Sequence, residues 1–346
     1  MSRNQRIFYA CQAVAITPRG AANVDPEHVV HGVQSIGMSS TFTLDQVFEQ
    51  GQIEIYENIE EVADIEVTLE KVIDGYKLIY DLATQGACKT DIVAASKARS
   101  DVYVAVFDDG LSHATGVPRN VVMNSGMYVS SVSYSYSIDG SATESVTLVG
   151  NDRFWNAETA GGVIGTSAAS AWGTSDPTQN IDGTDTPLSG VVRRVNVDLA
   201  GSDLPGIVKS QSGDTADIVG RGGGHHIQSI SVSTDFGQEN IQELGRFGPY
   251  HRYATFPIEV TCEFEVISTS GDLVSVSGNA PNLGDNDIRI KDTAGTVLDL
   301  GSDGAGKNKL SSVSYSGADT GGGNATVSYS FSNFNVLKVD GGATHA

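Results

Sequence analysis

The chain carries three short motifs that each occur twice, in the same order. They are QSI at 34–36 and 228–230, IEVTLE at 65–70 with IEVTCE at 258–263, and SSVSYS at both 130–135 and 311–316. The distance from the first motif to the second is nearly equal in the two copies, with 31 residues from Gln34 to Ile65 and 30 residues from Gln228 to Ile258. Because a long-period repeat defines an architecture before any single motif does, the sequence predicts two copies of one structural unit.

The repeated acidic segments predict β-strands. In residues 65–70, apolar and polar side chains alternate strictly. This period of two is typical of a strand with one covered face and one exposed, acidic face. Residues 129–150 and 310–334 each predict a further pair of strands around a Gly-containing turn. We therefore predict an all-β fold with minor short helices, built from two tandem, duplicated β-sandwich or barrel domains.

Helices are expected only as short pieces. Residues 41–56 and 235–250 each combine Phe, a polar stretch, Gly and Tyr, with apolar residues three to four apart. This spacing predicts a short amphipathic helix or a structured loop, with Gly51 and Gly245 as its left-handed stop. Residues 91–102 are the best remaining helix candidate.

The predicted boundaries divide the chain into three parts. The first β domain is expected over residues 1–152 and the second over 191–346. Between them, residues 153–190 are rich in Gly, Ala, Ser, Thr and Asp. Such a composition is typical of a linker or surface loop, with Trp155 and Trp172 as candidates for docking it.

Charge and cysteine content narrow the function. The chain has 42 acidic and 21 basic residues, for a formal net charge of −21. This balance argues against a surface that holds phosphate backbones or anionic lipids. The three cysteines have no CxxC spacing, which fits a reducing compartment rather than a disulfide framework or a zinc site. No segment has the roughly 18–20 consecutive apolar residues that a membrane helix needs, so no membrane partner is expected.

No catalytic motif emerges. GRGGGHH at residues 220–226 lacks the helix and the Gly-Lys-Ser/Thr ending of a phosphate loop, and its adjacent histidines lack a spaced metal-binding partner. The Asp-bearing turns at 108–110 and 285–287 do not complete a calcium loop. We expect no catalytic residue, no metal and no cofactor, and hence no enzyme.

Residues 32–80, 226–268 and 309–339 resemble the major tail tube proteins of tailed bacteriophages. The resemblance covers most of both copies but not residues 153–190. It implies a β-sandwich with a flanking short helix and an extended loop. In that family, sheets join edge to edge around a six-fold ring, and rings stack into a tube that conducts the genome. The implied location is the virion, after synthesis in the cytoplasm of a host bacterium.

This resemblance, together with the repeated acidic face, yields two sets of candidate residues. The candidates that line a tube bore, where carboxylates would repel DNA phosphates, are Glu66, Glu70, Glu259, Glu263 and Glu265. The candidates for contacts between stacked rings are Phe42, Leu44, Phe48, Tyr56, Phe236, Ile241, Leu244 and Tyr250.

The expected partners are further copies of the chain. Three chains would close a ring if each domain takes one of six positions; six chains would be needed if only one domain lines the channel. Other tail proteins are also expected: the terminator, the baseplate or tip, the tape measure and, as an option, a sheath. DNA would pass through the bore without specific binding.

Other classes stay open at this point. One alternative is another virion structural protein, such as a head decoration protein or a tail terminator. A second is a carbohydrate-binding β-sandwich, which would also be acidic and Ser/Thr/Gly-rich. A carbohydrate-binding domain should also present exposed aromatic platforms and an export signal. A glycoside hydrolase would need a cleft with a carboxylate pair.

Overall fold

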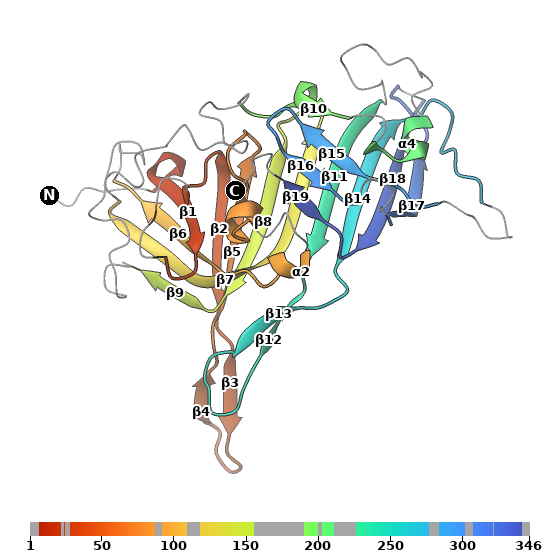
Figure 1. Cartoon of the computed structure of the whole chain (residues 1–346). Coiled ribbons are helices and arrows are strands. Elements are labelled where there is room, and N and C mark those ends of the chain that lie inside the picture. Colours follow the sequence, from red (N-terminus) through yellow and green to blue (C-terminus); the bar gives the residue numbers. More distant parts are fainter. Residues whose placement is uncertain are drawn as a thin grey trace.

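The computed structural model confirms the all-β prediction (Figure 1). It describes residues 7–21, 24, 28–86, 92–108, 118–155, 190–199, 203–210, 226–276, 284–301, 307–320 and 322–340. The helical elements in these residues are short: α1 (Ile79–Ala83), α2 (Ile92–Ala95), α4 (Gly206–Ser210), and the 3-10 turns η1 (Tyr9–Cys11) and η5 (Arg194–Asn196). Strands therefore carry the architecture.

Eight antiparallel strands form a central sheet that runs through both halves of the chain. In spatial order they are β17 (Lys309–Ser316), β18 (Thr326–Phe334), β14 (Glu259–Ile267), β11 (Ile227–Asp235), β7 (Asn120–Ser137), β8 (Thr143–Gly150), β5 (Asp64–Val72) and β2 (Val33–Thr41). The pairing of β7 with β11, which we call the internal junction, joins the first half to the second. Strands β2 and β17 form the two outer edges of this order.

Two smaller sheets cover one face of the central sheet. The first has the order β1 (Gln12–Pro18), β6 (Ser100–Val106), the N-terminal part of β7, and β9 (Asp152–Trp155). The second has the order β10 (Val197–Asp198), β15 (Arg289–Asp292), β16 (Val297–Asp299) and β19 (Lys338–Asp340). Val104 and Ile290 of these sheets belong to the same buried core as Val146 and Phe264 of the central sheet, so each half is a two-layer sandwich.

The strands of the two halves pair in the same order. In the first half the order is β2, β5, β8, β7, and in the second it is β11, β14, β18, β17. Irregularities recur at matching places. The register shifts between Val33 and Ser35 and again between Ile227 and Ser229. It also shifts between Val129 and Ser131 and between Leu310 and Ser312. These bulges fall on the repeated QSI and SSVSYS motifs, which explains why those letters recur.

The acidic motifs, in contrast, are not aligned letter for letter. After the first bulge, Ser35 lies opposite Glu70, and in the second half Ser229 lies opposite Glu265. Glu70 and Glu265 therefore occupy matching positions, whereas the sequence match would place Glu70 with Glu263. A shift of two residues keeps every side chain on its face, because the strand period is two. The predicted alignment is wrong by two residues, and the predicted faces are unaffected.

Residues 41–56 and 235–250, for which the sequence predicts a short helix or a structured loop, contain no helix. Both segments form β-hairpins: β3 (Leu44–Phe48) pairs with β4 (Ile55–Glu60), and β12 (Gln238–Ile241) pairs with β13 (His251–Ala254). Gly51 and Gly245 do have positive φ, of 97° and 83°, but they serve the hairpin loops. Ile, Val, Phe and Tyr, which favour extended backbone, flank these loops and outweigh the helix-like spacing. Both hairpins project from the same end of the sheet (Figure 1).

Of the other local predictions, the hairpins are confirmed and the helix is shorter than predicted. The hairpins predicted in 129–150 and 310–334 are confirmed as β7–β8 and β17–β18. The helix predicted over 91–102 is limited to Ile92–Ala95, since β6 already begins at Ser100. Strand β9 occupies the start of the predicted linker, and residues 156–189, including Trp172, lie outside the described residues. The division into two domains stays a prediction.

Candidate assembly surfaces

The central sheet has one face that no layer of the described chain covers, here called the polar face. Along β14, buried Val260, Cys262 and Phe264 alternate with more exposed acidic or hydroxyl side chains. Strand β5 follows the same pattern. The five predicted bore residues all lie on this face: Glu66, Glu259 and Glu263 are exposed, and Glu70 and Glu265 are half-buried. The structure thus brings them together on one surface, while their orientation toward a bore stays a prediction.

Small hydroxyl side chains fill the space between these carboxylates. The register defines rows across the sheet, and one row runs Ser35, Glu70, Ser145, Ser133, Ser233, Thr261, Ser332. Within the face, Ser35 donates to Glu70 at 3.3 Å and Ser229 donates to Glu265 at 3.1 Å, so the matching positions of the two halves make the same contact. The polar face is therefore hydroxylated and negatively charged.

Basic side chains are scarce on this face. Lys71 is the single basic residue of β5 and β14, and it is fully buried beneath the sheet. Its Nζ lies 3.2 Å from the Asp74 carboxylate and donates to the Lys77 carbonyl oxygen at 2.9 Å. The lysine thus belongs to the interior and does not pair with the glutamates of the polar face.

The two hairpins, here called the arms, carry a concentration of exposed apolar side chains. Of the eight predicted stacking residues, seven are exposed and all seven lie on the arms or at their base. The exception is Phe236, which is fully buried, with its ring centroid 6.2 Å from that of Tyr80. We therefore leave Phe236 out of the stacking surface. Exposed apolar patches of this kind mark interaction surfaces.

Sequence reasoning missed several arm residues. Ile53 and Phe247 are highly exposed in the hairpin loops, and Ile59 and Tyr253 are exposed on the strands. An apolar residue between Gln52 and Glu54 would have been a usable signal, because turn tips rarely carry an isoleucine without a partner.

Side chains of the second half also form hydrogen bonds to the first half near the internal junction. Arg252 of β13 is buried and donates to the Asp64 carboxylate at 2.7 Å and to Asn151 Oδ1 at 3.2 Å. His251 Nδ1 lies 3.0 Å from the Tyr128 hydroxyl. The base of the second arm is therefore fixed to the first half of the chain, and none of these contacts is apparent from the sequence.

A buried carboxylate supports the first half from within. Glu144 of β8 accepts hydrogen bonds from the backbone N–H groups of Ile79 and Tyr80, at 2.6 and 3.0 Å, and from the Tyr134 hydroxyl at 3.1 Å. Burial raises the pKa of Glu144 above the ordinary glutamate value, although the charge of Lys71 and these hydrogen bonds oppose the shift. Its contacts are structural, because they secure the start of α1.

The described residues provide no grouping of three or more His, Cys, Asp and Glu side chains that could hold a metal ion. Cys11 and Cys262 are free and buried, and burial raises the pKa of the Cys262 thiol. Most of the GRGGGHH segment lies outside the described residues. Within the described residues, no helix is long and apolar enough to cross a membrane.

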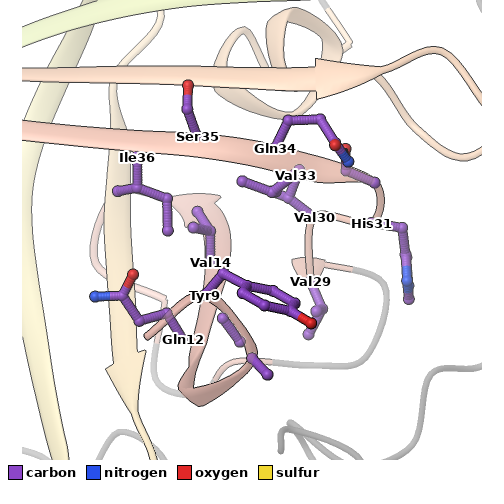
Figure 2. Close-up of a pocket in the computed structure, with 13 residues that line it drawn as sticks. Tyr9, Gln12, Val14, Val29, Val30, His31, Val33, Gln34, Ser35 and Ile36 are labelled. Carbon is purple, nitrogen blue, oxygen red and sulfur yellow. The ribbon is translucent and has the colours of Figure 1, made fainter. Parts of the chain in front are cut away.

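A hollow opens beside the outer edge strand β2 (Figure 2). It measures about 580 Å³ and lies between η1, β1 and β2. Val14, Val30 and Ile36 line it together with polar Gln12 and Gln34. The hollow is thus the side of the sandwich core at the place where the sheet ends, rather than a closed ligand cavity.

Comparisons with known proteins give limited information. No family model and no curated protein matches the chain. Among solved structures, the chain is similar to one from the sheath–tube complex of an extracellular contractile injection system (PVC) in its extended state, with 10% identity and a TM-score of 0.33 over 44% of this chain and 93% of that one. Chains from the anti-feeding prophage baseplate and from its tube-terminating cap match with 14% and 12% identity and TM-scores of 0.31 and 0.33; each match covers 45% of this chain, and 97% and 93% of the solved chains, respectively. These scores are too low to carry an argument about fold or function.

Proposed function

We propose that the protein is the structural subunit of a phage tail tube. Three copies close a ring, rings stack into a tube, and the polar face lines the bore through which DNA passes. Its partners are further copies of itself and the proteins at the ends and inside of the tail. Its place is the virion, after synthesis in the host bacterial cytoplasm. This function uses the surfaces described above and requires no catalytic residue.

One observation carries the proposal: the two halves, with the same strand order, are already joined edge to edge at the internal junction. Exposed strand edges are a liability unless they are paired, and ring closure pairs all of them. The outer strand β2 holds the same position in the first half as β11 does in the second. The outer strand β17 holds the same position in the second half as β7 does in the first. Three chains would then supply six equivalent positions, which supports the interpretation of the chain as a duplicated unit.

The composition of the polar face supports its place in the bore. Carboxylates repel phosphate groups, and their field extends about 8 Å at physiological salt. Hydroxyl side chains add hydrogen-bonding groups without positive charge. DNA would therefore be kept from adhering to the wall while it moves.

The arms support the stacking of rings. Their apolar side chains, from Leu44 to Tyr56 and from Ile241 to Tyr250, are exposed in the described chain. Both arms extend from one end of the sheet (Figure 1), where they would reach the next ring. Burial of such side chains contributes about 1.5–3 kcal/mol each, enough to hold rings together over many contacts.

Electron microscopy of the purified protein tests the proposal. We expect rings or hollow filaments, and class averages should contain three chains per ring, with native mass spectrometry giving multiples of three. Six chains per ring would retain the tube function and reject the three-chain arrangement. A protein that stays monomeric at high concentration and in the presence of its tail partners would contradict the proposal.

A further inference from the structure

We infer that β17 of a second copy of this chain pairs with β2 in one defined register, the one used by β7 and β11 at the internal junction. The inference deepens the proposed ring and rests on it. It also assigns Phe42 and Tyr315 as the side chains that anchor this contact between chains.

The β-bulges provide the correspondence between strands. Counting from the bulge, Ser35 of β2 corresponds to Ser229 of β11, because each is the first residue after the bulge and lies opposite a matching glutamate. In the same way, Ser312 of β17 corresponds to Ser131 of β7. The outer edges therefore match the two strands of the internal junction position by position, as far as Ser316 at the end of β17.

This correspondence fixes the register between chains. At the internal junction, Ser233 lies opposite Ser133 and Val232 lies opposite Tyr134. The same register places Ser39 opposite Ser314 of the second copy. It also places Met38 opposite Tyr315. Antiparallel strands with a covered face tolerate no slip by one residue, because a slip would turn every apolar side chain outward.

Exposure differs sharply between matching residues. Tyr134 is 1% exposed at the internal junction, whereas its counterpart Tyr315 is 52% exposed at the outer edge. Phe236, which follows β11, is 0% exposed, whereas its counterpart Phe42, which follows β2, is 69% exposed. At the internal junction β7 and β11 lie side by side, whereas the described chain has no strand beside the outer edges of β2 and β17. A second copy that pairs with β2 would cover both side chains.

The backbone around Phe236 shows how this anchor is held. Its N–H donates to the Ser130 carbonyl oxygen at 2.7 Å, one step beyond the last paired residues of the junction. The counterpart is a bond from the Phe42 N–H to the carbonyl oxygen of Ser311 in the second copy. Phe42 was predicted from the sequence to join stacked rings, and we now assign it to the contact within a ring.

The hollow beside β2 is explained by the same contact (Figure 2). Ile36 lines this hollow and is half-buried, whereas its counterpart Ile230 is 2% exposed at the internal junction. In the proposed register the last residue of β17, Ser316, lies opposite Gly37, so Gly317 and the chain that follows it would lie beside the hollow. The occupant is a second copy because this chain carries both complementary edges. Head-to-tail contacts of this kind form a ring where the rotation between copies closes.

Cysteine cross-linking tests the register. Ser39 and Ser314 are both exposed, so Ser39→Cys and Ser314→Cys in one chain, with Cys88→Ser to remove a native thiol, should not disturb the fold. A short thiol cross-linker should then yield covalent dimers and trimers. Ser133→Cys with Ser233→Cys is the matched control, because the same register operates there within one chain and should give a cross-linked monomer. Ser35→Cys with Ser314→Cys, four residues out of register, should give little product.

The outcomes separate this inference from the proposed function. Three-chain rings without the Ser39–Ser314 product, while the Ser133–Ser233 control reacts, would overturn the register and leave the tube function standing. Absence of both rings and products between chains would overturn both. Strong products from the out-of-register pair would also overturn the register.

Substitution of the anchor is an independent test. Phe42→Ser should raise the concentration needed for ring formation at least about tenfold, as expected for an interface hot spot, without lowering Tm, since the side chain is exposed in the single chain. Phe236→Ser should lower Tm because it disrupts the core. If rings form at the usual concentration with Phe42→Ser, the assignment of Phe42 to the contact between chains is wrong.

Discussion

The guanidinium of Arg252 lies 2.7 Å from the Asp64 carboxylate, although 188 residues separate them in the sequence. The arginine also donates to Asn151 and to the Gly150 carbonyl oxygen, so a side chain at the base of the second arm binds two segments of the first half. Arg252 is buried whereas Asp64 is exposed. The contact adds a side-chain link between the two halves to the backbone pairing of β7 with β11.

Arg252→Ala should lower the stability of the chain. The change removes a buried donor and leaves the Asn151 and Gly150 oxygens without it, at a cost of about 1–3 kcal/mol. Chemical denaturation measures this loss. Arg119→Ala is the control, since the Arg119–Asp108 pair is exposed and 3.6 Å long. Its effect should stay within about 0.5 kcal/mol. Equal effects of the two changes would contradict the structural role of Arg252.

Glu144 should make stability depend on pH. Because burial raises its pKa in the folded state, the folded chain binds more protons than the unfolded chain between the two pKa values. The free energy of unfolding should therefore fall as pH rises from the unfolded value of about 4.3 toward the raised folded value. Glu144→Gln removes this contribution, so the difference between wild type and variant should show the slope in that window.

Reversing the charge of the polar face should increase the retention of DNA by the tubes. Glu66→Lys, Glu259→Lys and Glu263→Lys introduce cations at exposed positions, so tubes should still assemble but retain DNA at low salt. Co-sedimentation of tubes with duplex DNA, and ejection from assembled virions, measure the effect. The matching Glu→Gln changes should retain less DNA, because they remove charge without reversing it. Normal ejection by the Lys variants would contradict the assignment of this face to the bore.

The arm tips should control filament length. Ile53 and Leu244 are fully exposed in the two hairpin loops. Ile53→Ser with Leu244→Ser should leave Tm and ring formation unchanged, because neither side chain packs within the chain. The lengths of filaments in micrographs should shorten toward single rings. Full-length filaments would show that stacking depends on other residues.

The sequence predicted the fold class because its signals were local. Strict alternation around Ile65 and the Gly-containing turn near Asp139 each depend on a few neighbouring residues, and both were confirmed. The arms were mistaken for helices because the spacing of Leu44, Val47 and Phe48 also fits a helix turn. In such short segments, the β-branched and aromatic composition decides the outcome.

Contacts between residues far apart in the sequence could not be predicted, because they depend on how the whole sheet is assembled. The pairing of Arg252 with Asp64 depends on the whole central sheet, which brings β13 to β5. Phe42 and Phe236 stand in similar local contexts, yet Phe42 is exposed and Phe236 is buried beside Tyr80 of the first half. The acidic motifs misled the alignment by two residues because strand alternation makes a shift of two nearly invisible in the sequence.

Both arms leave the sheet at the same end (Figure 1), and this gives any stack of rings a direction. Every ring would offer arms at one end and a surface to receive them at the other, so the two extremities of the filament would differ chemically. Growth would then start from one kind of template and stop with a different kind of cap. A filament built this way has a polarity fixed by the fold of each subunit.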